Sequence, residues 1–416
     1  MTGPPAASEL GLDWYASTGQ GTGGSLKNRP EDFVVREVED FNYDDEGRHV
    51  VARISLRNYE THRFARDLSN QLGISRKRVN WAGTKDKRAV TTQVFTVDTD
   101  PEKLEEVGMG GVDIDVLGRS HHPISLGDLM DNKFEVTVRG VENPAAVEPV
   151  DSDLEEFGGV PNLFGGQRFG SRRPVTHRVG RQVLEEDYRS AVLSYLVDSF
   201  ETEPKDTRRA RIRLKNEMDF GDALQYFPER LGYELSLLNE LVQGSGYREA
   251  FDAFPDNLQR LFVNAEQSRI FNLILRERYE SGLKFDRAYP GDVVCFSSDG
   301  YPDKSRTQRV KESNVESINR HVDAGRAYVT APLLGSETEL GEGDIGKMER
   351  EVIDGVGLSR EYFTDVGFAD YDGDRRPILI HPNPEHGIEE NVAEFRFSLP
   401  KGSYATVVLR EYTKNR

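Results

Sequence analysis

The sequence predicts an α+β protein in which one domain is inserted into another. Roughly the first 140 residues read as strands with one helix among them, and after about residue 172 helical patterns dominate. A strand pattern like the opening ones returns near residue 394. The chain has 416 residues, which is more than one compact core usually holds. We therefore predict one domain formed by residues 1–171 and 366–416, with a second domain, residues 172–365, inserted in it.

The strands are predicted from the alternation of apolar and polar side chains, which is typical of strands with one buried face. The opening helix, residues 61–72, is predicted from Phe64, Leu68 and Leu72, which recur at helical spacing. Thr61 is its expected N-cap. The expected strands of the two β-rich parts are residues 33–38, 49–56, 91–97, 133–138 and 394–399.

The middle of the chain reads differently. Helical patterns run through residues 210–281, and a further helix is expected at 347–356. Short strands are expected at 292–296 and 327–333. Residues 402–412 fit a helix or a strand, and the pattern does not decide between them.

The composition excludes several classes of protein. The chain has no run of about 18 apolar residues, and its first residues lack a basic patch followed by an apolar stretch. We therefore expect neither a membrane span nor a signal peptide. Cys295 is the single cysteine, which excludes an internal disulfide and a cysteine-based zinc site. A cytoplasmic protein is expected.

The net charge of −18 argues at first against a nucleic-acid partner, because phosphate contacts need Lys and Arg. The acid excess is spread along the chain and the basic residues are mostly Arg. That pattern suits a halophilic protein, which we expect; an acidic mesophilic protein is the alternative.

Three basic islands interrupt this acidic chain. Residues 76–88 hold six basic residues and one acidic, residues 161–181 hold five Arg and no acidic residue, and residues 205–215 hold six basic residues and one acidic. One interpretation pairs them with carboxylates elsewhere in the fold, and the other places them along a groove for a polyanion. Three islands together favour the groove.

Three segments combine a flexible backbone with reactive or stacking side chains. Lys27 follows a glycine-rich stretch and stands just before a strand. Asp86 lies between two lysines on a glycine-led loop, and neighbouring cations favour the charged form of a carboxylate, which can act as a nucleophile or a base. Asn132 and Phe134 begin a strand, where alternation places both on one face.

Each of these residues also has a purely structural interpretation. Asp86 fits one half of a surface ion pair, Lys27 a solvated side chain and Phe134 a core residue. Spacing alone does not decide between the two interpretations.

Longer signatures that include these residues are more specific. They are KNRPEDFVVREVED (Lys27–Asp40), WAGTKDKRAVTTQ (Trp81–Gln93), SLGDLMDNKF (Ser125–Phe134) and PNLFGGQRFGSRRP (Pro161–Pro174), with weaker matches at AEQSRIFN (Ala265–Asn272) and FSLPKGSYATVVLREY (Phe397–Tyr412). In type and order they resemble the TruD family of tRNA pseudouridine synthases. One departure is Asp131, since the family often has Gly directly before the Asn.

The resemblance implies a mixed, largely antiparallel pseudouridine-synthase sheet, with an α/β domain inserted after residues 167–170. It makes residues 1–171 and 366–416 the catalytic domain and residues 172–365 the inserted TRUD domain. It implies an enzyme that isomerises uridine 13 in the D arm of tRNA to pseudouridine. Asp86 matches the family's catalytic aspartate and Lys27 the lysine near it. Asn132 and Phe134 match the residues that contact the target base.

The target uridine must leave the folded tRNA, which costs about a few kcal/mol. We expect Arg168, together with Arg172 and Arg173, to offset this cost through contacts with the RNA backbone.

The isomerisation breaks the bond between ribose and uracil N1, turns the base and rejoins it through C5. No electrons or outside atoms are exchanged, so no metal or other cofactor is expected. The expected partner is tRNA, and neither a membrane nor a protein partner is predicted.

Three other classes of protein are alternatives to this enzyme. A non-catalytic RNA-binding protein or RNA chaperone would require loss of the carboxylate, and Asp86 is present. A deaminase needs a His/Cys zinc signature, and a methyltransferase needs a glycine-rich turn from strand to helix. The single cysteine argues against the zinc signature, and no stretch of the sequence makes a convincing turn of that kind.

Overall fold

The computed structural model describes residues 7–39, 41–298 and 300–415. The first six residues, part of the segment expected not to be a signal peptide, lie outside the described residues, as does Asp40 at the end of the first signature. The chain forms two compact units. Unit 1 comprises Met1–Tyr15 and Pro161–Leu379, and unit 2 comprises Ala16–Val160 and Ile380–Arg416.

The boundaries of these units differ from those of the predicted domains. The predicted domains are residues 1–171 with 366–416, and residues 172–365. The two short strands β7 (Val160–Pro161) and β12 (Leu379–Ile380) stand where the chain passes from one unit to the other. Compactness alone assigns no role to a unit, so the division into a catalytic and an inserted domain stays a prediction.

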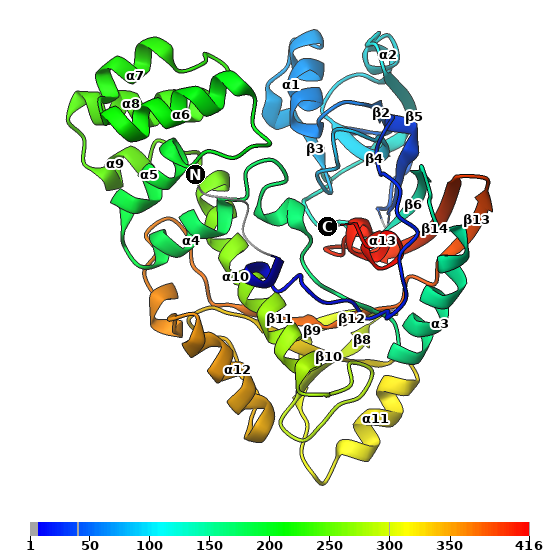
Figure 1. Cartoon of the computed structure of the whole chain (residues 1–416). Coiled ribbons are helices and arrows are strands. Elements are labelled where there is room, and N and C mark those ends of the chain that lie inside the picture. The colour runs from blue at the N-terminus through cyan, green and yellow to red at the C-terminus, as the bar shows by residue number, and fades with distance from the viewer. Residues whose placement is uncertain (1–6, 40, 299, 416) are drawn as a thin grey trace. The chain divides into compact units, whose positions relative to one another are not determined.

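Unit 2 is built on an eight-stranded sheet with the order β13-β14-β6-β1-β4-β2-β5, and β3 pairs with β4 at one side (Figure 1). β1 and β4 run parallel, whereas the other neighbours are antiparallel. The strands are β1 (Phe33–Glu39), β2 (His49–Arg57), β3 (Val79–Trp81), β4 (Val90–Val97), β5 (Val112–Ser120), β6 (Leu129–Arg139), β13 (Glu385–Glu389) and β14 (Val392–Pro400). This confirms the predicted mixed, largely antiparallel sheet.

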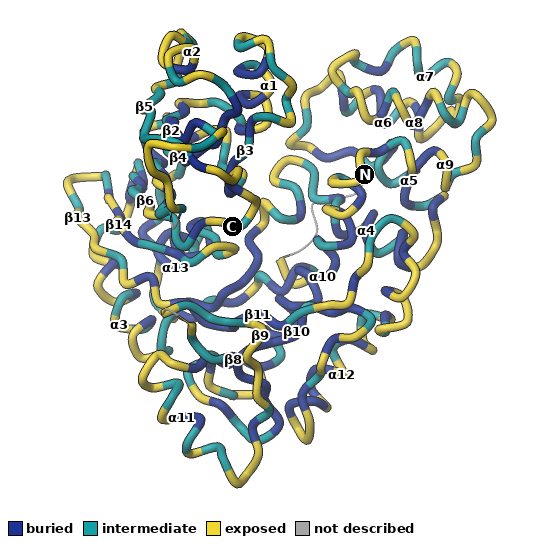
Figure 2. Tube along the Cα trace, turned by 180° about the vertical axis from the view of Figure 1, so that it is seen from behind, coloured by how far each residue is buried: buried dark blue, intermediate teal, exposed yellow. Residues whose placement is uncertain are grey.

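One face of this sheet holds the predicted site residues. Because side chains alternate along a strand, Phe33, Val35 and Glu37 of β1 share that face. The antiparallel register places Phe134 opposite Val35, and Asn132 opposite Glu37. The central strands are largely buried, and the outer strand β13 is mostly exposed, as Figure 2 shows.

Helices cover the two halves of the same face. α1 (Thr61–Gln71) packs Phe64 against Phe95 of β4, with ring centroids 5.3 Å apart. α13 (Ala405–Thr413) packs Tyr412 against Phe395 of β14, at 4.8 Å. The other helical segments of unit 2 are η2 (Pro30–Asp32), η3 (Arg76–Arg78), α2 (Pro101–Glu105), η4 (Pro144–Ala146) and α3 (Val147–Phe157).

The undecided segment 402–412 thus ends in a helix. The prediction that Thr61 caps α1 is wrong, because the N-cap is Glu60, whose carboxylate accepts hydrogen bonds from the backbone N–H groups of His62 and Arg63. A carboxylate at this place also faces the positive end of the helix dipole. Thr61 is the first helical residue and turns its hydroxyl toward β4, where it donates to Gln93 Oε1.

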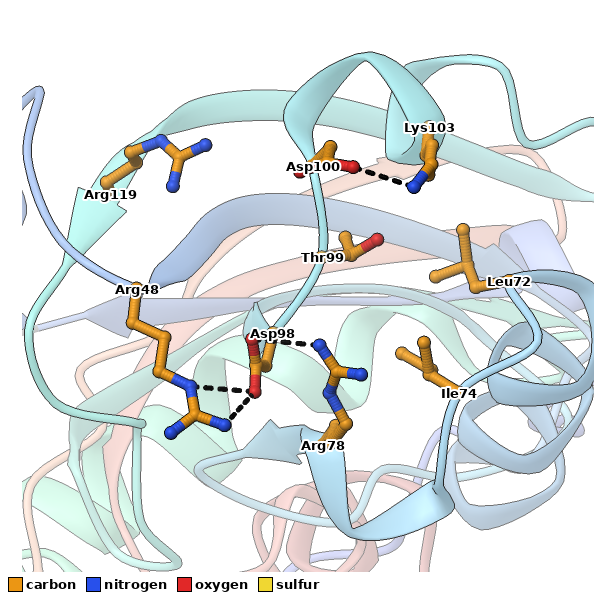
Figure 3. A pocket seen from close by; sticks show the side chains of 9 residues that line it. All are labelled: Arg48, Leu72, Ile74, Arg78, Asp98, Thr99, Asp100, Lys103 and Arg119. Carbon is orange, nitrogen blue, oxygen red and sulfur yellow. Dashed lines mark hydrogen bonds and ion pairs between the residues drawn. The ribbon is translucent and has the colours of Figure 1, made fainter.

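A cluster of charged side chains lies at the C-terminal end of β4 (Figure 3). Asp98, which follows that strand, accepts hydrogen bonds from Arg48 at 2.6 Å and pairs with Arg78 at 3.0 Å. These two guanidinium groups lower the pKa of Asp98 to about 2. The cluster lines a pocket of about 250 Å³ that also includes Arg119 and Lys103. Since the Asp86 loop precedes the other end of β4, the cluster and that loop lie at opposite ends of the strand.

Unit 1 combines a four-stranded antiparallel sheet, in the order β11-β10-β8-β9, with a group of helices. The strands are β8 (Val293–Ser298), β9 (Tyr301–Arg309), β10 (Ala327–Leu333) and β11 (Asp374–Pro377). The α-helices are α4 (Thr176–Leu184), α5 (Tyr188–Val197), α6 (Lys205–Glu217), α7 (Phe220–Tyr226), α8 (Gly232–Gln243), α9 (Tyr247–Phe251), α10 (Asp256–Glu280), α11 (Val315–Asp323) and α12 (Gly343–Gly355). Single 3₁₀ turns are η1 (Ala7–Leu10), η5 (Gly166–Phe169) and η6 (Arg360–Phe363). In the described part of the chain, no helix is both long and apolar enough to cross a membrane.

Candidate active site

A short ion pair joins two of the predicted site residues. Lys27 Nζ lies 2.6 Å from Asp86 Oδ2, although the two residues are 59 positions apart in the chain. The Lys27 side chain is 14% exposed and the Asp86 side chain 39% exposed. The carboxylate is therefore accessible from solvent while one of its oxygens is held by a more buried ammonium group.

The backbone on both sides of Lys27 is fixed by unit 2. Ser25 forms an isolated antiparallel bridge with Arg139 at the end of β6, and Asp32 accepts hydrogen bonds from the backbone N–H of Arg29 and from Arg139. Lys27 itself has a φ of 58°, in the left-handed region that side chains other than Asn and Asp seldom adopt. This conformation turns the ammonium group over the Phe33 ring, 4.1 Å from its centroid.

The loop that carries Asp86 runs from β3 to β4 and is attached to its surroundings through its backbone. Gln93 Nε2 donates to the carbonyl oxygen of Gly83, and the N–H of Lys85 donates to the Thr61 hydroxyl at 3.2 Å. Arg88 donates to the carbonyl oxygen of Asn28 at 3.0 Å, which ties this loop to the segment that carries Lys27.

The two lysines beside Asp86 differ in their surroundings. Lys87 is exposed, whereas the Lys85 ammonium group lies 2.7 Å from Glu37 Oε2 with its side chain only 8% exposed. The ammonium group that contacts Asp86 comes from Lys27, which is distant in sequence, and not from the adjacent Lys85.

Phe134 and Asn132 lie on the same sheet face, next to the Lys27 support. Phe134 is 8% exposed; its ring stacks on Phe397 at 5.5 Å and meets the edge of Phe33 at 6.0 Å. Asn132 is half-buried, and among the described residues its Oδ1 has no hydrogen-bond partner. Phe33 therefore links Lys27 to Phe134, and Phe134 packs as a core residue that keeps a small exposed fraction.

Arg168 belongs to unit 1, unlike the four residues above. It lies in η5, where its Nε donates to Ser268 Oγ at 3.0 Å. The site described above is formed by residues of unit 2.

The two basic islands of unit 1 are partly internal. Arg173 donates to the carbonyl oxygens of Ser194 and Tyr195. It lies 3.8 Å from both Glu203 and Glu234, and burial lowers its pKa to about 10. Arg211 pairs with the same two carboxylates and is 1% exposed. For these two arginines, the interpretation that pairs basic residues with carboxylates elsewhere in the fold is correct, and a phosphate contact by Arg173 is not supported.

Sequence reasoning did not identify Phe33 and Glu37 as members of this site. A signal for Glu37 was present, because the alternation of β1 puts a carboxylate on the same buried face as Phe33 and Val35. Phe33 has no such signal, since a phenylalanine on an apolar face is ordinary. Within the described ranges, no three His, Cys, Asp or Glu side chains gather in a way that could hold a metal ion.

Comparison with known proteins assigns the family. Residues 9–412 match the family model of tRNA pseudouridine synthase D (TruD). Proteins described as probable tRNA pseudouridine synthase D from Natronomonas pharaonis and Halobacterium salinarum are 45% and 44% identical to this chain, covering 99% of it and 97% and 98% of their own lengths. A crystal structure of the putative tRNA pseudouridine synthase D from Methanosarcina mazei superposes with a TM-score of 0.83 at 40% identity, covering 98% of both chains. The chain belongs to the TruD family of tRNA pseudouridine synthases.

Proposed function

We propose that the protein isomerises uridine 13 in the D arm of tRNA to pseudouridine, with Asp86 as the catalytic carboxylate. The observation that carries this proposal is the 2.6 Å pair between Lys27 and Asp86, in which Asp86 remains 39% exposed. A carboxylate that is held by a cation and open to solvent can reach a nucleotide and act as a nucleophile or as a base.

The reaction needs little beyond such a group. The bond from ribose C1′ to uracil N1 breaks, the uracil turns, and a bond from C1′ to C5 forms while the proton of C5 is lost and N1 gains one. Atoms and electrons balance within the substrate, so the chemistry calls for no redox cofactor and no metal. Asp86 attacks the ribose or the base, or takes up a proton.

The other predicted residues receive supporting roles in this proposal. Lys27 orients the Asp86 carboxylate, and Phe134 and Asn132 contact the uracil while it is detached. Aromatic stacking suits this task, because it tolerates rotation in the plane of the ring. Arg168 contacts the RNA backbone, which makes it a residue for binding and not for chemistry.

We further propose that the protein works in the cytoplasm of a halophilic cell. The net charge of −18 supports this setting, as do relatives described from Halobacterium and Natronomonas. Salt that screens the phosphates weakens ionic contacts with RNA, so such an enzyme depends more on shape and stacking than on its basic residues.

A direct assay tests both proposals. Unmodified tRNA transcript is incubated with the protein in dilute and in multimolar KCl, and pseudouridines are mapped by position. We expect conversion at position 13, at a higher rate in concentrated salt, and none in a transcript with cytidine at that position. Conversion of another uridine with position 13 untouched would overturn the assignment of the target, and a rate optimum in dilute salt would overturn the halophilic setting.

Phe134 and Phe397 provide a matched pair for the stacking role, because both are buried on one face and contact each other. Each is replaced by Leu, which keeps most of the apolar volume and removes the ring. We expect similar losses of stability, measured by thermal unfolding, and a turnover that falls about 10-fold only in Phe134→Leu, since stacking on a base is worth about 1–3 kcal/mol. Equal turnover of the two variants would make Phe134 a core residue and nothing more.

A further inference from the structure

A second ion pair lies beneath the Asp86 loop. Lys85 Nζ is 2.7 Å from Glu37 Oε2, and the two side chains are 8% and 0% exposed. Lys85 is the residue directly before Asp86, and Glu37 stands on β1, on the face that also holds Phe33 and Asn132. The pair thus connects the central strand of the sheet to the residue next to the proposed catalytic carboxylate.

The environment of Glu37 makes this pair a poor source of stability. Burial raises the pKa of the Glu37 carboxyl group, and the charge of Lys85 only partly offsets the effect. Its second oxygen, Oε1, is buried and has no hydrogen-bond partner of ordinary geometry among the described residues, although the nearby Gln93 amide also helps to lower the pKa of the carboxyl group. Buried ion pairs of this kind often contribute no more to folding than apolar side chains of the same size. Stability therefore does not explain the Glu37–Lys85 pair, whereas the position in which it holds the neighbouring residues can.

The pair is the last of several attachments along the loop before Asp86. The carbonyl oxygen of Ala82 accepts a hydrogen bond from Gly127, that of Gly83 accepts one from Gln93, and the N–H of Lys85 donates to Thr61. Consecutive Cα atoms are about 3.8 Å apart, so a shift of the Lys85 backbone moves Asp86 with it. Glu37 also binds the ammonium group of Lys85, which is the buried one of the two lysines adjacent to Asp86 in the chain.

We propose that Glu37 is a positioning residue, which holds Lys85 in a buried ion pair. This pair fixes the backbone at Asp86, and it keeps Lys85 away from the Asp86 carboxylate, which is then bound by Lys27 alone of these two lysines. The proposal rests on the proposed function, because it concerns the same carboxylate. Without Glu37, the Lys85 ammonium group is released beside Asp86, where it competes with Lys27 for the same oxygens and the loop loses its innermost attachment.

The test compares Glu37→Gln, Lys85→Met and the double variant with the full-length wild type. Single-turnover rates on tRNA transcript, dissociation constants for the same tRNA and melting temperatures are measured for each. Asp98→Asn is the matched control, since Asp98 is likewise a largely buried, ion-paired carboxylate of unit 2, 11% exposed, but lies at the other end of β4.

We expect the single-turnover rate of Glu37→Gln to fall by about 10- to 100-fold with tRNA binding within about threefold, because a misplacement of about 1 Å can cost that much. Lys85→Met should lose a similar factor, and the double variant should lose the same factor as either single variant, because both changes break one pair. Asp98→Asn should lower the melting temperature without lowering the rate.

Three results would overturn the positioning role: a double variant within twofold of the wild-type rate, losses that multiply in the double variant, or an equal loss of rate in Asp98→Asn at a similar melting temperature. Should Glu37→Gln fail to fold, the double variant decides, since it buries no unpaired charge. A wild-type protein that makes no pseudouridine, or an active Asp86→Asn, would instead refute the proposed function. The two failures are therefore distinguishable.

Discussion

Asp86→Asn is expected to lower pseudouridine formation by about 10⁴-fold or to background, because the amide can neither attack as a nucleophile nor take up a proton. The substitution keeps the shape of the side chain, and the Asp86 carboxylate is partly exposed, so the fold should be unaffected. Single-turnover assays on tRNA transcript measure the rate, and filter binding measures the affinity, which should stay within several-fold of the wild type.

The outcome separates catalysis from binding. A variant that binds tRNA and does not convert it supports the assignment of Asp86 to the chemical step. Residual turnover close to that of the wild type would move the catalytic role to another residue. Loss of binding and activity together would indicate that Asp86 serves mainly to hold the substrate.

Lys27→Met is expected to produce the second largest loss, about 100-fold in single-turnover rate, because the carboxylate loses the group that fixes its orientation. Met retains an unbranched apolar stem that can pack over Phe33, so the local packing is kept. A pair in which Asp86 is 39% exposed contributes little to folding, about 1 kcal/mol or less, and the melting temperature should change only slightly.

Lys87→Met is the matched control for this variant. Lys87 is exposed and adjoins Asp86 in the chain, so its loss removes one positive charge from beside Asp86 without breaking the pair with Lys27. We expect a rate within about twofold of the wild type. If both variants lost the same factor, the contribution would be a general one of positive charge near the RNA backbone, and Lys27 would have no special place beside Asp86.

Much of the sheet could be predicted from the chain, because its strands have one buried face. The alternation in residues 33–38 and 133–138 identified β1 and β6, which the structure extends to Phe33–Glu39 and Leu129–Arg139. The three-residue strand β3 carries no periodic signal of that kind, since its pairing with β4 comes from tertiary contact. Residues 402–412 stayed undecided because their burial by the sheet, and not their propensity, makes them a helix.

The members of the candidate site could be predicted, and its connections only in part. Family signatures identified Lys27, Asp86, Asn132 and Phe134 and placed Lys27 near Asp86, a contact across 59 positions that spacing alone could not show. The sequence suggested that the two neighbouring lysines keep Asp86 charged, whereas in the structure Lys85 forms its ion pair with Glu37. Such choices between nearby partners depend on which face of a strand a side chain occupies, and that depends on the pairing of distant segments.

The central strand β1 supports both ion pairs from the same side: Phe33 lies under the ammonium group of Lys27, and Glu37 binds that of Lys85. In a strand, a slip of one residue exchanges the two sides, so both supports would leave together. A chain with such a slip would therefore lose the supports of both ion pairs at once, instead of keeping one of them.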